Sequence, residues 1–231
     1  MKSRSYDDLT KQELIEQLKA RDRKDATRFG LVWEADEIER DKALNFDFVA
    51  LDLDPALSNG DGPWRNLIIE GDNYDALRAL KLGFAGRVKC IYIDPPYNTG
   101  NKDFVYNDRF VDKEHAWRHS LWCEFMFRRL ELAKDLLAPD GVIFVSIDDN
   151  EVFHLGLLMN RVFGESNWIS TMIWQKSYGG GAKAKHIVGL HEYVLCYALS
   201  KEQIPQISLP PNPDVLKYYK FSDAKLSQRG P

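Results

Sequence analysis

The stretch that decides the fold is Val88-Lys89-Cys90-Ile91-Tyr92-Ile93-Asp94-Pro95-Pro96-Tyr97-Asn98-Thr99-Gly100. Its first six residues form a largely apolar run that is typical of a buried strand. The two prolines cannot continue that strand, so a loop carries Asp94 and Tyr97 just beyond its carboxyl end. Open α/β sheets bind their ligands at this edge, and the loop is therefore the first place to look for chemistry.

Apolar patterns on both sides of this stretch predict alternating strands and helices. The predicted strands are 66–70, 88–93 and 142–147, and the predicted helices are 74–82, 115–137 and 150–163. This order indicates an α/β fold in which a parallel sheet is joined by crossover helices, and the continuous apolar strands indicate helices on both faces. Two further strands are predicted at 168–175 and 192–198.

The regions before and after this pattern differ from it. Thr10 and Glu13 form a capping box that predicts a helix over 11–23, followed by a polar helix within 29–42 and a strand-like run at 46–53. Beyond Ser200, the prolines at positions 205, 210, 211 and 213 prevent regular structure. We therefore expect an N-terminal helical appendage and linker over 1–63, a main domain over 64–200, and either an irregular tail or the start of a further region over 201–231.

Composition excludes several classes of protein. Apolar residues make up 44% of the chain, as in a globular domain. No apolar run approaches the roughly 20 residues needed to span a bilayer, and we read no export signal at the start. The three cysteines are far apart and lie in apolar segments, which favours reduced thiols and a cytoplasmic location. The net charge of −4 comes from residues 1–54, which hold 14 acids and 10 Lys and Arg.

The residues that follow the predicted strand 88–93 suit one chemical task. The exocyclic amine of adenine is a weak nucleophile, because its lone pair is delocalised into the ring. The Asp94 carboxylate and the Pro95 carbonyl could each accept one of its hydrogens and favour the nucleophilic form. Tyr97 offers an aromatic face on which a base taken out of the duplex could stack.

Asp94-Pro95-Pro96-Tyr97 after an apolar strand resembles the signature of amino-group DNA methyltransferases, and the longer string 92–100 is similar to the modification subunits of type III restriction–modification systems and their β-class relatives. Three further blocks match in family order, at 66–80, at 137–151, and at 167–176 together with 191–195. The resemblance implies a Rossmann-like methyltransferase fold of circularly permuted order, with 64–200 as its target-base half and 201–231 as the start of target recognition. It implies adenine-N6 methylation of DNA. Cytosine-N4 relatives more often carry Ser at the first motif position, and that alternative stays open.

The resemblance also implies the site. Catalysis falls to Asp94, Pro95, Pro96 and Tyr97, without a covalent enzyme intermediate, and the cofactor is S-adenosylmethionine. Asp72 and Asn73 are expected near the adenine of the cofactor, with Asp94 between donor and target. From the residues alone, Asp72 fits equally well as a helix N-cap. Asp148 and Asp149 are interpreted as caps for the following helix. We find no His or Cys cluster, and we expect no metal.

The stretch from Thr171 to His191, which includes the loop 177–186, contains no acid, but it contains Lys176, Lys183 and Lys185. We expect these lysines to bind DNA phosphates, with Gly179-Gly180-Gly181 as a mobile loop beside the duplex. A plain solvated connector has the same composition, so the residues alone do not choose between the two interpretations.

The family's Gly-rich donor loop, a Phe-x-Gly-x-Gly turn after a strand, has no counterpart in this sequence. We therefore expect the donor-binding half of the fold to be missing, a hydrophobic sheet edge to be exposed, and activity of this chain alone to be doubtful. The expected partners are double-stranded DNA and a complementing C-terminal half, a second modification subunit or a restriction subunit. Two other hypotheses are a non-catalytic DNA-binding or assembly piece and a methyltransferase of RNA or protein amino groups.

Overall fold

The structure is a computed structural model that describes residues 10–26, 31–33, 49–60, 62, 66–100, 105–106, 109–110, 117–178, 186–205 and 207. Several sequence predictions lie outside these residues. They are the glycine cluster 179–181, Lys183, Lys185, most of the polar helix within 29–42, and nearly all of the tail 201–231.

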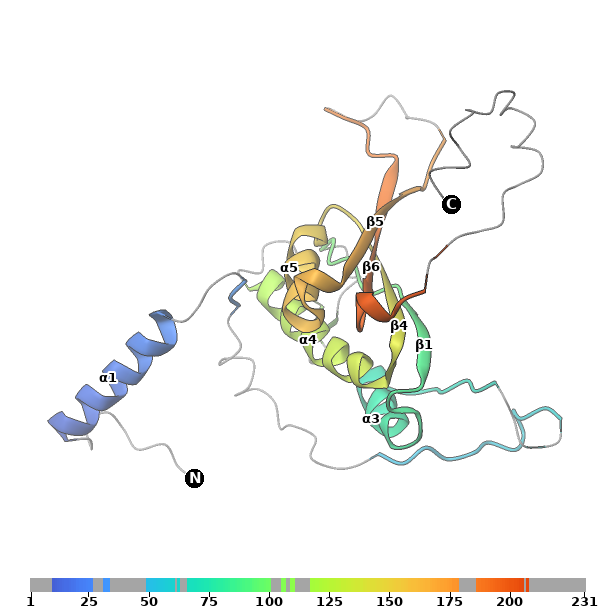
Figure 1. Ribbon diagram of the computed structural model, residues 1–231, viewed down its shortest axis with the longest axis horizontal. Coiled ribbons are helices and arrows are strands. Elements are labelled where there is room, and N and C mark those ends of the chain that lie inside the picture. Colours follow the sequence, from blue (N-terminus) through green and yellow to red (C-terminus); the bar gives the residue numbers. More distant parts are fainter. Residues whose placement is uncertain are drawn as a thin grey trace, which may run out of the picture.

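The centre of the fold is a four-stranded mixed sheet with the order β1-β4-β6-β5 (Figure 1). Its strands are β1 (Val88–Ile93), β4 (Leu137–Ile147), β5 (Trp168–Gln175) and β6 (His191–Ala198). β1 and β4 run parallel, as predicted for strands joined by a crossover helix. β6 is antiparallel to both β4 and β5, so the two strands predicted last form a hairpin at one side of the sheet. The predicted α/β class is confirmed.

The helices that connect these strands also lie where the sequence predicts them. They are α3 (Asn73–Phe84), α4 (Arg118–Leu136) and α5 (Val152–Phe163). α1 (Lys11–Ala26) begins at the predicted capping box, in which the Thr10 and Glu13 side chains each accept a hydrogen bond from the other's backbone N–H. Short elements complete the described chain: the strand pair β2 (Val105–Tyr106) and β3 (Arg109–Phe110), and the 3-10 helices η2 (Glu165–Asn167) and η3 (Lys201–Gln203).

The core lies between the sheet and one layer of helices. Figure 1 shows α4 and α5 side by side on one face of the sheet. Alternate β4 side chains, Ile143, Val145 and Ile147, are completely buried beneath these helices. On the opposite face Tyr92 is 62% exposed. The expectation of helices on both faces is thus not met within the described residues.

Two predicted strands are wrong. Residues 66–70 and 49–53 have no strand structure, and Leu67 and Ile68 are 58% and 101% exposed. A strand needs a hydrogen-bonding partner in a sheet. Within the described residues β1 is an edge strand of the main sheet, and neither segment pairs with it. Apolar character alone therefore did not suffice to place these segments in the sheet.

The turn from α4 into β4 is tighter than predicted. The predicted helix 115–137 and strand 142–147 left residues 138–141 as a connection, but the helix ends at Leu136 and Pro139, Asp140 and Gly141 belong to an irregular first part of β4. A Cβ atom on Gly141 would lie 2.8 Å from the Ala138 carbonyl oxygen and 2.9 Å from that of Val88. Gly141 is therefore required because the backbone of β1 and the preceding residues of β4 approach it closely. Among the described helices, none is long and apolar enough to cross a membrane.

Candidate functional site

The motif loop, residues 94–100, follows directly on β1 at the carboxyl end of the parallel strand pair. Its first residue, Asp94, is exposed, the two prolines and Tyr97 are half-buried, and Asn98 is completely buried. The loop thus turns from solvent into the protein within five residues. This pattern leaves a carboxylate and one aromatic side chain accessible on a segment whose far end is anchored.

Helix α4 holds the loop backbone. The indole Nε1 of Trp122 donates a hydrogen bond of 2.7 Å to the Pro96 carbonyl oxygen. Trp122 itself is 0% exposed and belongs to the hydrophobic core. The carbonyl predicted to accept a hydrogen from the adenine amine is that of Pro95, one residue before the carbonyl that the indole binds. The indole therefore holds the backbone next to this predicted acceptor.

Asn98 anchors the other end of the loop. Its backbone has a φ of 57°, in the left-handed region that Asn tolerates better than most residues. Its side-chain amide donates hydrogen bonds to the Glu151 carboxylate and to the Arg118 carbonyl oxygen. The loop is therefore tied to the start of α4 and to the residue that precedes α5.

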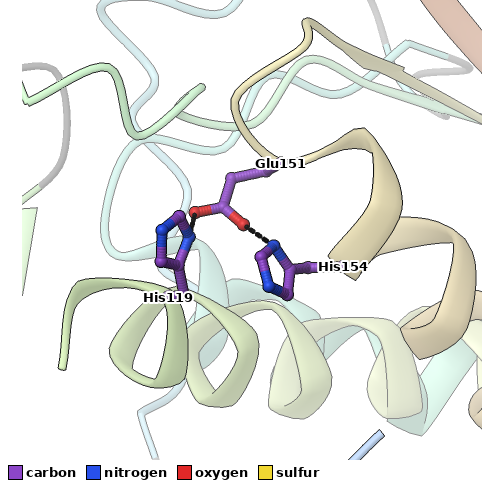
Figure 2. A group of neighbouring side chains, drawn as sticks. All are labelled: His119, Glu151 and His154. Carbon is purple, nitrogen blue, oxygen red and sulfur yellow. Dashed lines mark hydrogen bonds and ion pairs between the residues drawn. The ribbon is translucent and has the colours of Figure 1, made fainter.

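Glu151 is the centre of a buried polar cluster that it forms with His119 and His154 (Figure 2). Its two carboxylate oxygens lie 2.6 Å from His119 Nδ1 and 2.9 Å from His154 Nδ1. Burial raises the pKa of Glu151 to about 7, although the hydrogen bond from Asn98 and the charge on His154 oppose the shift. Burial also lowers the pKa of His119, and nearby Arg118 lowers it further.

Tyr97 joins the motif loop to the β5–β6 hairpin. Its hydroxyl donates a hydrogen bond of 3.4 Å to Glu192 Oε2, and Lys176 Nζ lies 3.1 Å from Glu192 Oε1. The pKa of Tyr97 is raised, first by burial and then by a hydrogen bond to Asp94. The structure therefore brings Asp94, Tyr97 and Lys176 together, and it pairs the charge of Lys176 with a carboxylate.

Asp72 and Asn73 lie in a different contact group. The Asp72 side chain accepts a hydrogen bond of 2.8 Å from Tyr74 N, so the residue is the N-cap of α3. Arg129 of α4 donates to Asn73 Oδ1, and its guanidinium lies 3.7 Å from Asp72. The capping interpretation is confirmed, and a cofactor contact for these two residues stays a prediction.

The interpretation of Asp148 and Asp149 as caps of the following helix was wrong, because the N-cap of α5 is Glu151 and its side chain makes no capping hydrogen bond. The Asp148 carboxylate accepts bonds of 2.9 and 2.8 Å from the backbone and side chain of Asn150, which precedes the helix, while Asp149 accepts one of 2.9 Å from the Tyr193 hydroxyl. α5 begins at Val152, two residues later than predicted.

Sequence patterns did not predict the roles of Asn98 and Trp122 or the presence of the Glu151 cluster, and the expectation that the chain has no histidine cluster was wrong. One signal was available, because Glu151 and His154 are three residues apart and such residues lie on the same face of a helix. The partner on α4, His119, is 32 residues away from Glu151, and only the packing of α4 against α5 brings it there.

The arrangement around Asp94 suits a planar ligand that carries a polar hydrogen donor. An exposed carboxylate can accept such hydrogens, and a half-buried tyrosine beside it supplies an aromatic contact. The loop that carries both is fixed from α4 and α5, so these groups need little reorganisation when a ligand arrives.

Comparison with known proteins gives a family for this site. The model of the DNA methylase family matches residues 88–230. The chain is 43% identical over 145 residues to a Haemophilus influenzae protein described as "Probable type III restriction-modification enzyme HindVI Mod subunit", covering 62% of this chain and 18% of that protein. It is 37% identical over 163 residues to the EcoP15I Mod subunit of Escherichia coli, covering 61% of this chain and 25% of that one. The chain thus spans a quarter or less of the length of these relatives.

Solved structures give a weaker similarity. PvuII DNA methyltransferase, described as cytosine-N4-specific, superimposes with a TM-score of 0.42 at 11% identity, covering 61% of this chain and 53% of that one. A complex of the methyltransferase M1.HpyAVI with SAM gives a TM-score of 0.41 at 14% identity, with coverage of 62% and 58%.

Proposed function

Because this chain belongs to the DNA methylase family, we propose that it carries the target-base site of a DNA adenine-N6 methyltransferase of the restriction–modification type. The observation that carries the proposal is the held motif loop. Trp122 and Asn98 fix it from the protein side, and Asp94 and Tyr97 remain accessible on the other side. We propose that the substrate is double-stranded DNA and that the chain acts in the cytoplasm.

The roles of the motif residues follow from their chemistry. Asp94 accepts one hydrogen of the adenine amine and the Pro95 carbonyl accepts the other, which draws the nitrogen towards its nucleophilic form. Tyr97 stacks on the base once it has left the duplex, and this stacking offsets part of the cost of unpairing it. These residues hold the amine in line for attack, so positioning and electrostatics provide the rate.

S-adenosylmethionine would supply the methyl group on a positively charged sulfur. The exposed carboxylate of Asp94 fits a cationic donor, and the side chain of Asp72 is 61% exposed beside α3. We propose that both face the donor. Glu192 also lies within hydrogen-bonding distance of Tyr97, but its charge is paired with Lys176, so Asp94 is the carboxylate of this region that we propose favours a cation.

The wider organisation is part of the same proposal. Residues 64–200 form the target-base part of the catalytic domain, 1–63 form an appendage, and 201–231 lead towards target recognition. The relatives named above are described as subunits of restriction–modification enzymes. Further chains of such an enzyme, a second modification subunit or a restriction subunit, are therefore the proposed protein partners.

A donor titration and a transfer assay test this function together. Calorimetry of the purified chain with S-adenosylmethionine should show saturable binding that Asp94→Ala weakens. The chain with methyl-labelled donor and genomic DNA should then label N6-methyladenine, identified after digestion to nucleosides. Tyr97→Phe keeps the aromatic ring and serves as the matched variant that should retain activity better than Tyr97→Ala.

The nucleoside analysis separates the alternatives. Label in N4-methylcytosine would show that the target base is cytosine and not adenine. Label in RNA or protein alone would exclude DNA as the substrate. DNA binding without donor binding would favour a non-catalytic assembly role. An absence of both donor binding and transfer would refute activity of this chain alone and identify it as an incomplete half, and the assay would then be repeated with a complementing C-terminal half. Transfer that Asp94→Ala leaves unchanged, or no transfer in the complemented assay, would refute the proposal.

A further inference from the structure

The Glu151 cluster has the composition of a metal site. It combines two imidazoles and one carboxylate, and the candidate ligand atoms of the three residues all lie within 4.8 Å of one another. In Figure 2 one imidazole comes from α4 and the other from α5, and both turn Nδ1 towards the carboxylate between them. The two rings are stacked, with centroids 4.6 Å apart.

The hydrogen bonds within the cluster do not satisfy all its polar atoms. Glu151 Oε2 and His154 Nδ1 are buried and lie 2.9 Å apart, but no aligned hydrogen bond reaches either atom. Buried polar atoms without partners are rare, and each one costs about 1–3 kcal/mol. A cation placed between them would satisfy both lone pairs at once.

We propose that His119, Glu151 and His154 bind one divalent transition-metal ion of the Zn²⁺ type. A tetrahedral Zn²⁺ site with ligand bonds of about 2.0–2.2 Å has ligand atoms roughly 3.3 Å apart. The present ligand atoms lie within 4.8 Å of one another, so coordination requires shifts of up to about 1.5 Å and a rotation of the two stacked rings towards a common point. Two histidines and one glutamate also form a known three-residue ligand set for zinc that leaves a fourth position to water.

Access and selectivity follow from the burial of the three residues. The Glu151 side chain is 0% exposed, whereas those of His119 and His154 are 41% and 37% exposed. An ion can therefore reach the cluster from the histidine side, where a water molecule can complete its shell. Imidazole nitrogen favours Zn²⁺, Co²⁺ and Ni²⁺ over Mg²⁺ and Ca²⁺, which prefer oxygen ligands.

Metal binding requires the protons to be rearranged. The ion replaces the proton shared by His119 Nδ1 and Glu151 Oε1, and the His119 ring then carries its proton on Nε2. Arg118, which donates to that Nε2 at 3.2 Å, must turn away towards solvent. The buried Glu151 carboxylate gains a neutralising charge in exchange, which offsets the cost of its burial.

The proposed ion would act on the motif loop through one residue. Asn98 donates to the same Glu151 oxygen that faces His119, so it would become the outer hydrogen-bond partner of a metal ligand. An ion that links α4, α5 and Glu151 would thereby stiffen the buried end of the loop. This role is structural and does not place the ion in contact with a substrate.

The test uses tag-free protein and Co²⁺ as the probe, because Co²⁺ reports its ligands through visible d–d absorption. We expect one Co²⁺ per chain, bands without thiolate charge transfer, displacement by Zn²⁺, and a Zn²⁺-dependent rise in melting temperature. His119→Ala and His154→Ala should each weaken binding at least about tenfold, since loss of an outer partner alone can cost that much. His186→Ala, at an exposed position outside the cluster, is the matched control and should bind like wild type.

Two results would overturn the proposal. One is the absence of saturable Co²⁺ or Zn²⁺ binding by the wild-type chain. The other is binding that His119→Ala and His154→Ala leave unchanged, which would place the ion elsewhere. If either variant fails to fold, the wild-type spectrum and stoichiometry still decide, because thiolate bands or a number of ions other than one contradict the assigned ligands. Neither readout needs methyl donor or DNA, so it is independent of the proposed function.

Discussion

Replacing Trp122 by Phe tests whether α4 fixes the motif loop. The substitution keeps an aromatic ring in the core but removes the Nε1–H that donates to the Pro96 carbonyl at 2.7 Å. The structure offers a matched control in Trp174→Phe, because Trp174 is 64% exposed on β5. The two variants make the same chemical change in opposite environments.

The magnitude follows from two contributions. Leaving the part-buried Pro96 carbonyl without its donor costs about 1–3 kcal/mol. The smaller ring leaves a void, and core voids cost about 24 cal/mol per Å³. We therefore expect Trp122→Phe to lower the free energy of unfolding by about 2–4 kcal/mol. Trp174→Phe should change it by less than about 0.5 kcal/mol, as exposed substitutions usually do.

Urea unfolding of the three proteins measures this difference, with the midpoint interpreted only if the slope is unchanged. Hydrogen exchange by mass spectrometry then tests the local claim. A peptide that covers the motif loop should exchange faster in Trp122→Phe, while peptides from α5 and β6 should change less. Equal stability of Trp122→Phe and Trp174→Phe, or an unchanged exchange rate in the loop, would refute the assignment of Trp122 as the residue that holds it.

Three further predictions concern the framework. Burial raises the pKa of Cys123 to about 12 and that of Cys196 to about 11. A thiol reagent at pH 8 should therefore modify only the exposed Cys90 in the native chain, and all three thiols in denaturant. A second thiol that reacts fast in the native chain would contradict the packing. Gly141→Ala should destabilise the protein by about 1–3 kcal/mol, because the added Cβ meets backbone oxygens. Gly156→Ala should stabilise it by about 0.5–1 kcal/mol, because Gly156 is helical and nothing lies within 4 Å of the added Cβ. Urea midpoints that shift in the same direction would refute this contrast. Loss of the α3 cap in Asp72→Ala should cost about 1 kcal/mol by the same measurement, and Asp72→Asn, which can still cap, should cost much less.

The elements with strong local patterns were predictable from the sequence. α3, α4, α5 and the four strands of the main sheet all lie near their predicted positions, because each carries its own apolar periodicity. The segment 66–70 was not predictable in this way, since an apolar run becomes a strand only if a neighbour pairs with it. Sequence patterns describe one segment at a time and cannot supply that neighbour.

The same limit explains which part of the site was found. Asp94 to Tyr97 are consecutive, so a motif can reveal them. The anchoring of the loop depends on side chains from two helices that approach only after packing, as Glu151 and Trp122 do with Asn98 and Pro96. Polar residues that are buried for such reasons look, in a sequence, like ordinary surface residues near a helix start.

Lys176 is linked to the motif loop through a shared carboxylate. Lys176 and Tyr97 share one carboxylate, that of Glu192, and the Lys176 side chain is 41% exposed. A partly exposed ion pair of this kind contributes about 0–1 kcal/mol, so a DNA phosphate can compete for the ammonium group at little cost. Under the proposed function, phosphate binding would release Glu192 from Lys176 and leave it with the Tyr97 hydroxyl alone. The Glu192 side chain would then couple phosphate binding at the β5–β6 hairpin to the position of the stacking tyrosine. Sequence spacing gave no reason to connect Lys176 with Tyr97.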